Sequence, residues 1–249
     1  MFERIAVKKI NSHVWLMDDN HEATGYLVVG NKKALVIDTM NGVENVLNIV
    51  RTITDLPVTV INTHGHCDHI YGNVFFEDAL IHELDLPIAY NHMNFPEFKA
   101  ELEKRGLTMP PYETVKDGDR IDLGGLHVRL IALSGHTPGG ILVLLEEDRI
   151  LFTGDAINRH LWMQLDESLP MESFYENLKS VMYLKNEADF ILHGHAHDLE
   201  NISLMDELLK GVFEICQGQT ENDKAYHWFG GEGRQHEFAK NSVICYKQK

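Results

Sequence analysis

The amino-acid sequence predicts an α/β fold in which two β-sheets pack as a sandwich with helices on the outside. Three observations lead to this prediction: a strand, helix, strand pattern in the first third of the chain, a run of short strands in the middle, and a helix followed by a buried strand in the last third. The first and the last pattern both end in histidines. We therefore expect the carboxyl ends of these strands to meet along one edge and to form a functional site there.

The first third of the chain predicts two parallel strands joined by a helix. Apolar residues at 25–29 and 34–37 flank Gly30-Asn31-Lys32, which is a β-hairpin pattern. Apolar residues then recur at helical spacing between Val43 and Ile53, before a strand that ends at Thr63. Such a unit is right-handed, and its functional loop follows the second strand.

The remaining elements follow from turn residues and apolar periodicity. Helices are expected over residues 71–79, 93–105, 171–185 and 201–216. An antiparallel meander of short strands is expected over residues 112–116, 120–123, 126–133, 140–145 and 149–153. A buried strand is expected at 190–192, and weaker strand patterns lie at 225–229 and 242–246.

Composition limits the classes of partner. The chain has 249 residues, with 22 Lys and Arg against 38 Asp and Glu, so its formal net charge is −16. Long-range repulsion disfavours nucleic acids and anionic membranes. No export signal or membrane span is recognisable, and the three cysteines form an odd, scattered set that suits reduced thiols. We expect a cytoplasmic protein that acts on a small molecule. The length of the chain allows either one large domain or two small ones. A homodimer is also possible.

One stretch carries most of the chemistry. Thr63-His64-Gly65-His66-Cys67-Asp68-His69 places three imidazoles and one carboxylate directly after a strand. In an extended segment His64 and His66 point the same way and can bind one cation through neutral imidazole nitrogens. Asp68 and His69 follow the turn and are placed to bind a second cation, as in two-metal hydrolytic sites. The alternative is a solvated histidine-rich loop.

Three further polar residues occupy equivalent places in the chain. His136, Asp155 and His195 each come after an expected strand, and each has glycine beside it, which allows a sharp turn and a close approach of backbone. Any one of them alone is more often a structural residue than a ligand. Together with the histidine-rich stretch they indicate a metal centre.

These motifs, in this order and over nearly all of residues 25–197, resemble those of the metallo-β-lactamase-fold hydrolase superfamily. The resemblance implies a four-layer αβ/βα sandwich of two mixed β-sheets flanked by helices, with residues 1–249 as a single domain. It also implies a binuclear metal site in which one metal is bound by His64, His66 and His136, the second by Asp68, His69 and His195, and both by a bridging Asp155. Asp38 would orient a ligand through a hydrogen bond.

The resemblance also implies a mechanism. A water that bridges two divalent cations loses a proton near neutral pH and becomes a hydroxide nucleophile, while one metal polarises the attacked oxygen. Asp68 is expected to orient this hydroxide and to carry a proton to the leaving group. The cofactors are expected to be two divalent ions, with zinc first and iron or manganese as alternatives.

The variable positions narrow the branch of the family. Asp155 and His69 resemble glyoxalase II, lactonases and tRNA-processing nucleases, whereas the commonest antibiotic-degrading branch has cysteine in place of Asp155. The short segment after His195 carries no basic cluster for glutathione, and the acidic charge argues against a nuclease. We expect hydrolysis of an ester, thioester, lactone or amide. The alternatives are a mononuclear iron, persulfide-dioxygenase-like oxidoreductase and a non-catalytic metal-binding member of the fold.

Two loops, residues 18–24 and 158–163, are expected to contact the substrate. The candidates there are His21, Arg159, His160, Trp162 and Met163. Trp162 and Met163 would form an apolar wall, Arg159 would pair with a carboxylate, and His160 would donate to a carbonyl. The alternative is that Trp162 and Met163 belong to the core and that Arg159 and His160 are solvated. His193 and His197 are expected to support the site or to lie on the surface.

Overall fold

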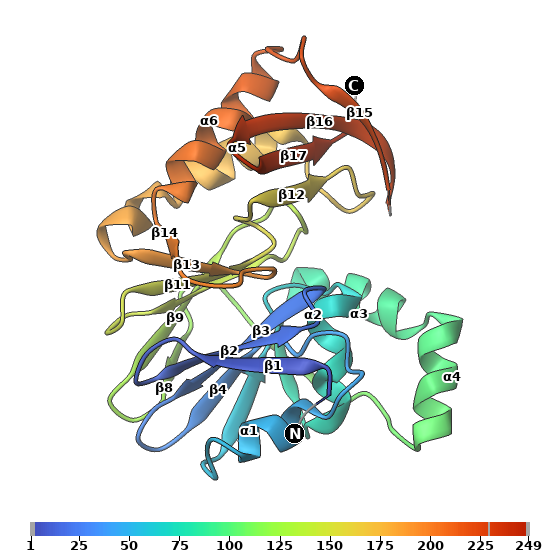
Figure 1. Ribbon diagram of the computed structural model, residues 1–249, viewed down its shortest axis with the longest axis vertical. Coiled ribbons are helices and arrows are strands. Elements are labelled where there is room, and N and C mark those ends of the chain that lie inside the picture. The colour runs from blue at the N-terminus through green and yellow to red at the C-terminus, as the bar shows by residue number, and fades with distance from the viewer. Residues whose placement is uncertain (1–2, 229, 248–249) are drawn as a thin grey trace.

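The computed structural model describes residues 3–228 and 230–247, which form three β-sheets with helices around them (Figure 1). Two of the sheets pack face to face, as the sequence predicts. The third sheet was not expected as such, and it stands at the end of the molecule that also carries α6. In the described part of the chain, no helix is long and apolar enough to cross a membrane.

The first sheet contains seven strands in sequence order. They are β1 (Ile5–Lys9), β2 (Val14–Asp19), β3 (Ala23–Val29), β4 (Ala34–Ile37), β5 (Val58–Ile61), β6 (Ala79–His82) and β7 (Tyr112–Val115). The predicted hairpin is confirmed as β3 and β4, which pair antiparallel. The predicted crossover is confirmed too, because α1 (Val46–Arg51) joins β4 to β5 and these two strands are parallel.

The second sheet has the strand order β14-β13-β11-β10-β9-β8. Its strands are β8 (Arg120–Asp122), β9 (His127–Ala132), β10 (Ile141–Leu145), β11 (Ile150–Gly154), β13 (Phe190–His193) and β14 (Glu200–Asn201). β8 to β11 form the predicted antiparallel meander, and β13 pairs parallel with β11. The strand at 112–116 was wrongly placed in this meander, because β7 pairs with β6 in the first sheet.

That error has a local cause. The chain after the histidine-rich stretch was expected to be helical over 71–79, but the helical part is a short α2 (Cys67–Ile70) followed by a 3₁₀ turn, η1 (Tyr71–Phe75). Ala79 then starts β6, in which buried and half-buried side chains alternate. Without β6 in the prediction, β7 had no partner in the first sheet. Two helices, α3 (Leu86–Met93) and α4 (Pro96–Arg105), fill the region between β6 and β7.

The core between the two large sheets explains their packing. Buried side chains of both sheets form one cluster, in which Tyr26 and Ile37 of the first sheet meet Val128 and Phe152 of the second. The rings of Tyr26 and Phe152 lie 5.1 Å apart. Burial of each such side chain contributes about 1.5–3 kcal/mol to the stability of the folded chain.

Helices cover the outer faces of both sheets. α1 buries Val46 and Ile49 against the first sheet, in a cluster of their own. On the other side, α5 (Met171–Ser180) and α6 (Leu204–Cys216) bury Phe174 and Leu208 against β11 and β13. The four-layer sandwich of the prediction is therefore confirmed.

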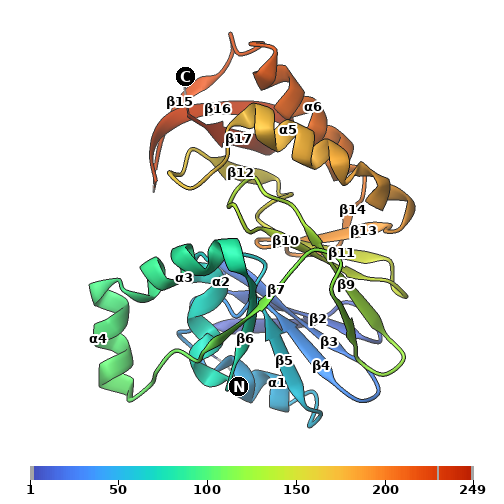
Figure 2. The same ribbon diagram turned by 180° about the vertical axis from the view of Figure 1, so that it is seen from behind.

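The third sheet is built from four strands in the order β12-β17-β16-β15. They are β12 (His160–Met163), β15 (Lys224–Trp228), β16 (Gly231–Ala239) and β17 (Ser242–Tyr246). The weak patterns at 225–229 and 242–246 correspond to β15 and β17, although residue 229 lies outside the described residues. β12 and β16 were missed, because β12 is a short segment within a loop and β16 is mostly polar. Figure 2 shows α5 and α6 lying against this sheet.

Candidate metal centre

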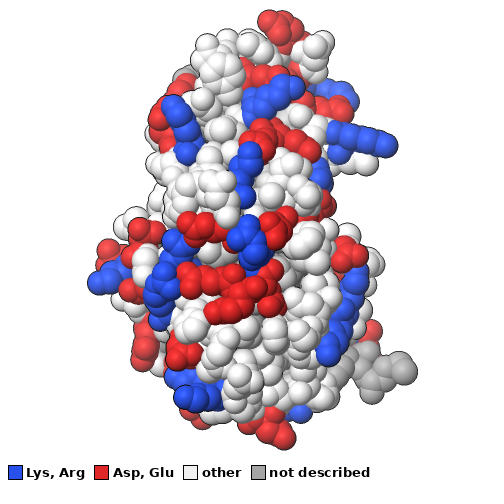
Figure 3. Space-filling model, turned by 90° about the vertical axis from the view of Figure 1, so that its left-hand side faces the viewer, with Lys and Arg blue, Asp and Glu red and all other residues white. Residues whose placement is uncertain are grey.

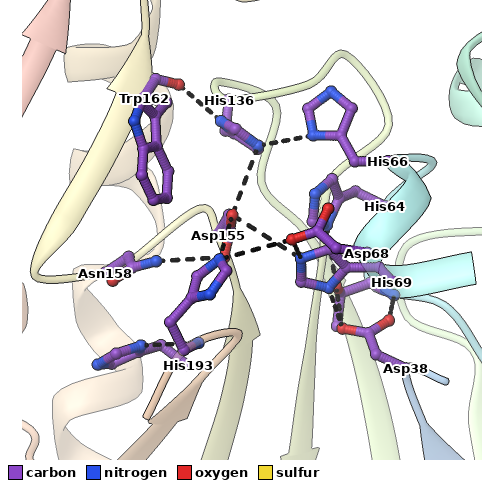
Figure 4. Close-up of polar contacts among 12 residues, drawn as sticks. Asp38, His64, His66, Asp68, His69, His136, Asp155, Asn158, Trp162 and His193 are labelled. Carbon is purple, nitrogen blue, oxygen red and sulfur yellow. Dashed lines mark hydrogen bonds and ion pairs between the residues drawn. The ribbon is translucent and has the colours of Figure 1, made fainter. Parts of the chain in front are cut away.

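The ends of five strands converge on one site, with side chains pointing toward a shared centre (Figure 4). Asp38 follows β4, and the histidine-rich stretch follows β5. His136 lies between β9 and β10, Asp155 follows β11, and His195 follows β13. β4 and β5 belong to the first sheet, whereas β9, β11 and β13 belong to the second. The site is therefore complete only when the two sheets pack together.

The first group of candidate ligands contains His64, His66 and His136. One ligand atom of each lies within 4.8 Å of the others, and all three side chains are buried. His136 Nε2 and His66 Nδ1 lie 3.0 Å apart. Burial lowers the pKa of His64 well below its ordinary value and that of His136 to about 4. Both rings are therefore neutral at neutral pH, the form that binds metals.

The second group contains Asp68, His69 and His195, whose ligand atoms also lie within 4.8 Å of one another. Asp155 lies between the two groups. Its Oδ2 is 3.2 Å from His195 Nε2 and 3.8 Å from His69 Nε2, and it is 3.9 Å from His136 Nε2. Burial raises the pKa of Asp155, but the charges of His195 and His69 outweigh burial and leave this pKa well below its usual range. The carboxylate is thus ionised.

Asp38 fixes the orientation of His69. The buried Asp38 carboxylate accepts hydrogen bonds from the backbone N–H and the hydroxyl of Thr63, both at 2.7 Å, and contacts His69 Nδ1 at 2.8 Å. A hydrogen on Nδ1 leaves the lone pair on Nε2, which faces Asp68 and Asp155. Burial lowers the pKa of His69, but Asp68, Asp38 and Asp155 outweigh it and raise this pKa, so a cation bound at Nε2 would take the place of a proton there.

Other orienting groups were missed from the sequence. Glu167 Oε1 lies 2.7 Å from His66 Nε2, and this hydrogen bond lowers the pKa of Glu167 to about 2. The backbone carbonyl of Trp162 lies 2.6 Å from His136 Nδ1, and Asn158 donates to Asp155 at 3.1 Å. A carboxylate or carbonyl behind a ligand histidine is the usual arrangement in metal sites. No local pattern marks Glu167, because 101 residues separate it from His66.

The buried carboxylate of Asp85 joins the loops that carry the first group. It accepts hydrogen bonds from the backbone N–H of Gly65 at 2.8 Å and of Gly139 at 2.6 Å, and from the hydroxyl of Thr137 at 2.8 Å. Gly65 stands between two candidate ligands, and Thr137 follows a third. A Cβ at Gly65 would lie 2.8 Å from the Asp85 carbonyl oxygen, so glycine is needed for this close approach.

The donor set fits a cation. Two buried ring nitrogens, His64 Nε2 and His69 Nε2, have no hydrogen-bond partner among the described residues. Buried polar atoms normally have a partner, because leaving one unsatisfied costs about 1–3 kcal/mol. Here both nitrogens lie in a group with the ionised Asp155. A metal ion bound by these nitrogens would satisfy all of them.

A cavity of about 710 Å³ opens onto the centre, and His66, Asp68, His136, Asp155 and His195 line it. Of the proposed substrate contacts, His21 and Trp162 line this cavity. His21 also belongs to a separate group at the cavity rim, in which Asp18 Oδ2 lies 2.8 Å from His21 Nδ1 and 3.3 Å from His197 Nδ1. His193 supports the site through its Nδ1, which accepts from the His195 N–H at 3.3 Å.

The other three expected contacts, Arg159, His160 and Met163, do not line this cavity. Met163 is buried in the core beneath α5 and α6. The guanidinium of Arg159 is held by Glu200, Glu207 and Ser242. His160 stacks on Trp162 at 4.2 Å on one side and contacts Cys245 Sγ at 3.3 Å. His160 and Met163 belong to β12, whose pairing with β17 the sequence did not reveal.

Comparison with known proteins gives a consistent picture. The family model described as "Metallo-beta-lactamase superfamily" matches residues 21–199. The acyl-coenzyme A thioesterase MBLAC2 of Gallus gallus is 26% identical over 62% of this chain and 66% of its own length. The hydroxyacylglutathione hydrolase of Yersinia pestis is 28% identical over 67% of this chain and 59% of its own length. The chain thus spans less than two thirds of each of these curated relatives.

A solved structure shares the fold. The structure of a metallo-β-lactamase from Erythrobacter litoralis superposes with a TM-score of 0.63, covering 86% of this chain and 98% of that one. Its sequence identity is 18%, so this likeness concerns the fold alone.

Proposed function

Because this chain belongs to the metallo-beta-lactamase superfamily, we propose that it is a binuclear metal-dependent hydrolase that cleaves an ester, thioester, lactone or amide bond of a small molecule. The observation that carries the proposal is the pair of three-residue ligand groups with Asp155 between them. The names of two relatives, a thioesterase and a hydroxyacylglutathione hydrolase, support thioesters among these four bonds.

His64, His66 and His136 would hold one metal ion, and Asp68, His69 and His195 the other, with Asp155 shared. Zinc is the first choice, because three or more imidazoles with a carboxylate suit it. When bound, two such ions supply a water of lowered pKa as nucleophile and polarise the carbonyl oxygen of the substrate. Three free cysteines fit a reducing compartment, and we propose the cytoplasm.

The protein's own contribution to the reaction centres on Asp68. Its Oδ2 lies 3.5 Å from His69 Nε2 and 3.8 Å from His195 Nε2, and the partly exposed side chain lines the cavity. Asp68 can accept the proton that the attacking water loses as its oxygen bonds to the acyl carbon. It then gives this proton to the oxygen, sulfur or nitrogen that leaves when the acyl bond breaks. His69 is kept in place by Asp38 during both steps.

The test replaces Asp68 by Asn. The zinc-loaded D68N variant should keep much of its metal and lose most of its turnover, because an amide cannot accept the proton; removal of such a group typically costs about 10²–10⁴-fold in rate. Hydrolysis is measured on a matched set of chromogenic esters, thioesters, lactones and amides. Asp189→Asn, which alters an exposed carboxylate paired with Arg149, is the control. Unchanged turnover in D68N would rule out the proton-transfer role.

A further inference from the structure

The third sheet places an aromatic wall above the metal centre. Trp162 of β12 and Trp228 of β15 both line the cavity, and their rings stack at 5.4 Å with an angle of 29° between the planes. Leu165 extends the apolar surface. Candidate ligands line the same cavity, and the ring of Trp162 meets His195 edge to face at 5.5 Å. The wall therefore lies within reach of a group held at the metal centre.

The inner part of the wall is held firmly. The indole N–H of Trp162 donates to the hydroxyl of Tyr226 at 3.0 Å, and His160 stacks against the indole at 4.2 Å. The backbone carbonyl of Trp162 lies 2.6 Å from Nδ1 of His136. The residue that forms the wall therefore also orients a candidate metal ligand. Trp228, in contrast, is 56% exposed. A large aromatic side chain exposed inside a cavity of this size is typical of a small-molecule site.

Apart from the two metal ions proposed above, which Asp68 and Asp155 would help to bind, the charged side chains around the cavity are acidic. The lining includes Glu22, Asp68 and Asp155, and among the described residues that line the cavity there is no Lys or Arg. The nearby Arg4 is paired with Asp19 and Glu22, and Arg159 is paired with two glutamates. On the face shown in Figure 3, Asp and Glu side chains across the middle of the molecule lie among Lys and Arg side chains. Beyond the proposed metal centre, a polyanionic carrier would find no Lys or Arg side chain among the described residues that line the cavity.

We propose, building on the hydrolase function above, that Trp162 and Trp228 form a stacking subsite for the acyl group of the substrate. The preferred acyl group is aromatic or similarly flat and apolar, and the leaving group carries no phosphate or cluster of carboxylates. In this subsite the acyl group packs against the exposed indole of Trp228. Trp162 stacks on Trp228 and contacts His195, and so positions Trp228 relative to the candidate ligands. This assigns a substrate class that differs from acyl-coenzyme A and glutathione thioesters.

The first experiment measures kcat/KM of the zinc-loaded enzyme for two thioesters of the small neutral thiol N-acetylcysteamine, one acetylated and one phenylacetylated. The wild type should prefer the phenylacetyl compound. Trp228→Ala should reduce this preference about three- to tenfold, the range expected for one aromatic contact. Tyr183→Ala removes another exposed aromatic ring, which is 45% exposed and does not line the cavity, and should leave the preference as it is. An unchanged preference in W228A would overturn the stacking subsite.

A second comparison tests the charge of the leaving group. Phenylacetyl-N-acetylcysteamine should be cleaved with a higher kcat/KM than phenylacetyl-coenzyme A, because the acyl group is the same and only the carrier charge differs. A preference for the coenzyme A ester would overturn this part of the proposal.

Binding separates this inference from the hydrolase proposal. Calorimetric titration with phenylacetamide and with acetamide needs no turnover, and W228A should weaken the binding of phenylacetamide selectively. If the wild type cleaves none of the four bond types, the proposed function fails, and the titration still decides the subsite. Equal affinity of wild type and W228A for phenylacetamide would refute the subsite even if hydrolysis is observed.

Discussion

Replacing Asp38 by Asn tests how the protein prepares His69 for metal binding. Asp38 has φ = 59°, a left-handed conformation that Asn also tolerates, so the substitution adds no backbone strain. The amide can keep its oxygen on the Thr63 N–H, but its NH₂ group then faces His69 Nδ1, which carries a hydrogen in the wild type. Two donors cannot pair. Either this contact is lost, or the hydrogen of His69 moves to Nε2, the atom that faces the metal centre.

The magnitude follows from the contact that is lost. One hydrogen bond to a charged group contributes about 1.5–3 kcal/mol, which corresponds to roughly a 10- to 100-fold change in an equilibrium constant. We expect the metal affinity of the site formed by Asp68, His69 and His195 to fall by this factor in D38N. Affinity is measured by competition with a chromogenic chelator, and a thermal melt of the metal-free protein reports folding separately.

The control for this experiment is Asp148→Asn. Asp148 also contacts an imidazole, His13 Nδ1, at 3.0 Å, but at a place remote from the centre. This variant should bind metal like the wild type. A D38N variant with wild-type metal affinity would refute the argument that Asp38 sets the hydrogen position on His69.

Two further predictions concern the third sheet. Gly211→Ala would place a Cβ 2.2 Å from Cβ of Phe238, which crowds the contact between α6 and β16. The free energy of unfolding, measured by urea denaturation, should fall by about 1–3 kcal/mol. An unchanged midpoint would contradict this packing. Burial raises the pKa of Cys245 to about 11, so its thiolate is scarce at neutral pH. Iodoacetamide at about pH 7.5 should leave Cys245 unlabelled in the native protein and label it in urea; fast native labelling would show that β17 is open.

The parts of the structure that the sequence predicts are those with a local pattern. β3, β4, α1 and β5 follow from hairpin residues and periodicity, and the candidate ligands stand directly after strands, where geometry brings them together. Glu167 and Asp85 carry no such pattern, because their partners lie far along the chain. The role of Trp228 depends on β12 pairing with β17, and a four-residue strand within a loop has too weak a pattern to reveal this pairing.

The central claim is a binuclear centre, and the metal content of the purified protein tests it most directly. Mass spectrometry should find about two equivalents of zinc, manganese or iron in the wild type and in D189N, and a clear loss in Asp155→Ala, because this carboxylate lies between both ligand groups. A single iron with oxygen consumption would favour a dioxygenase instead. No stoichiometric metal, or a content that D155A leaves unchanged, would contradict the account.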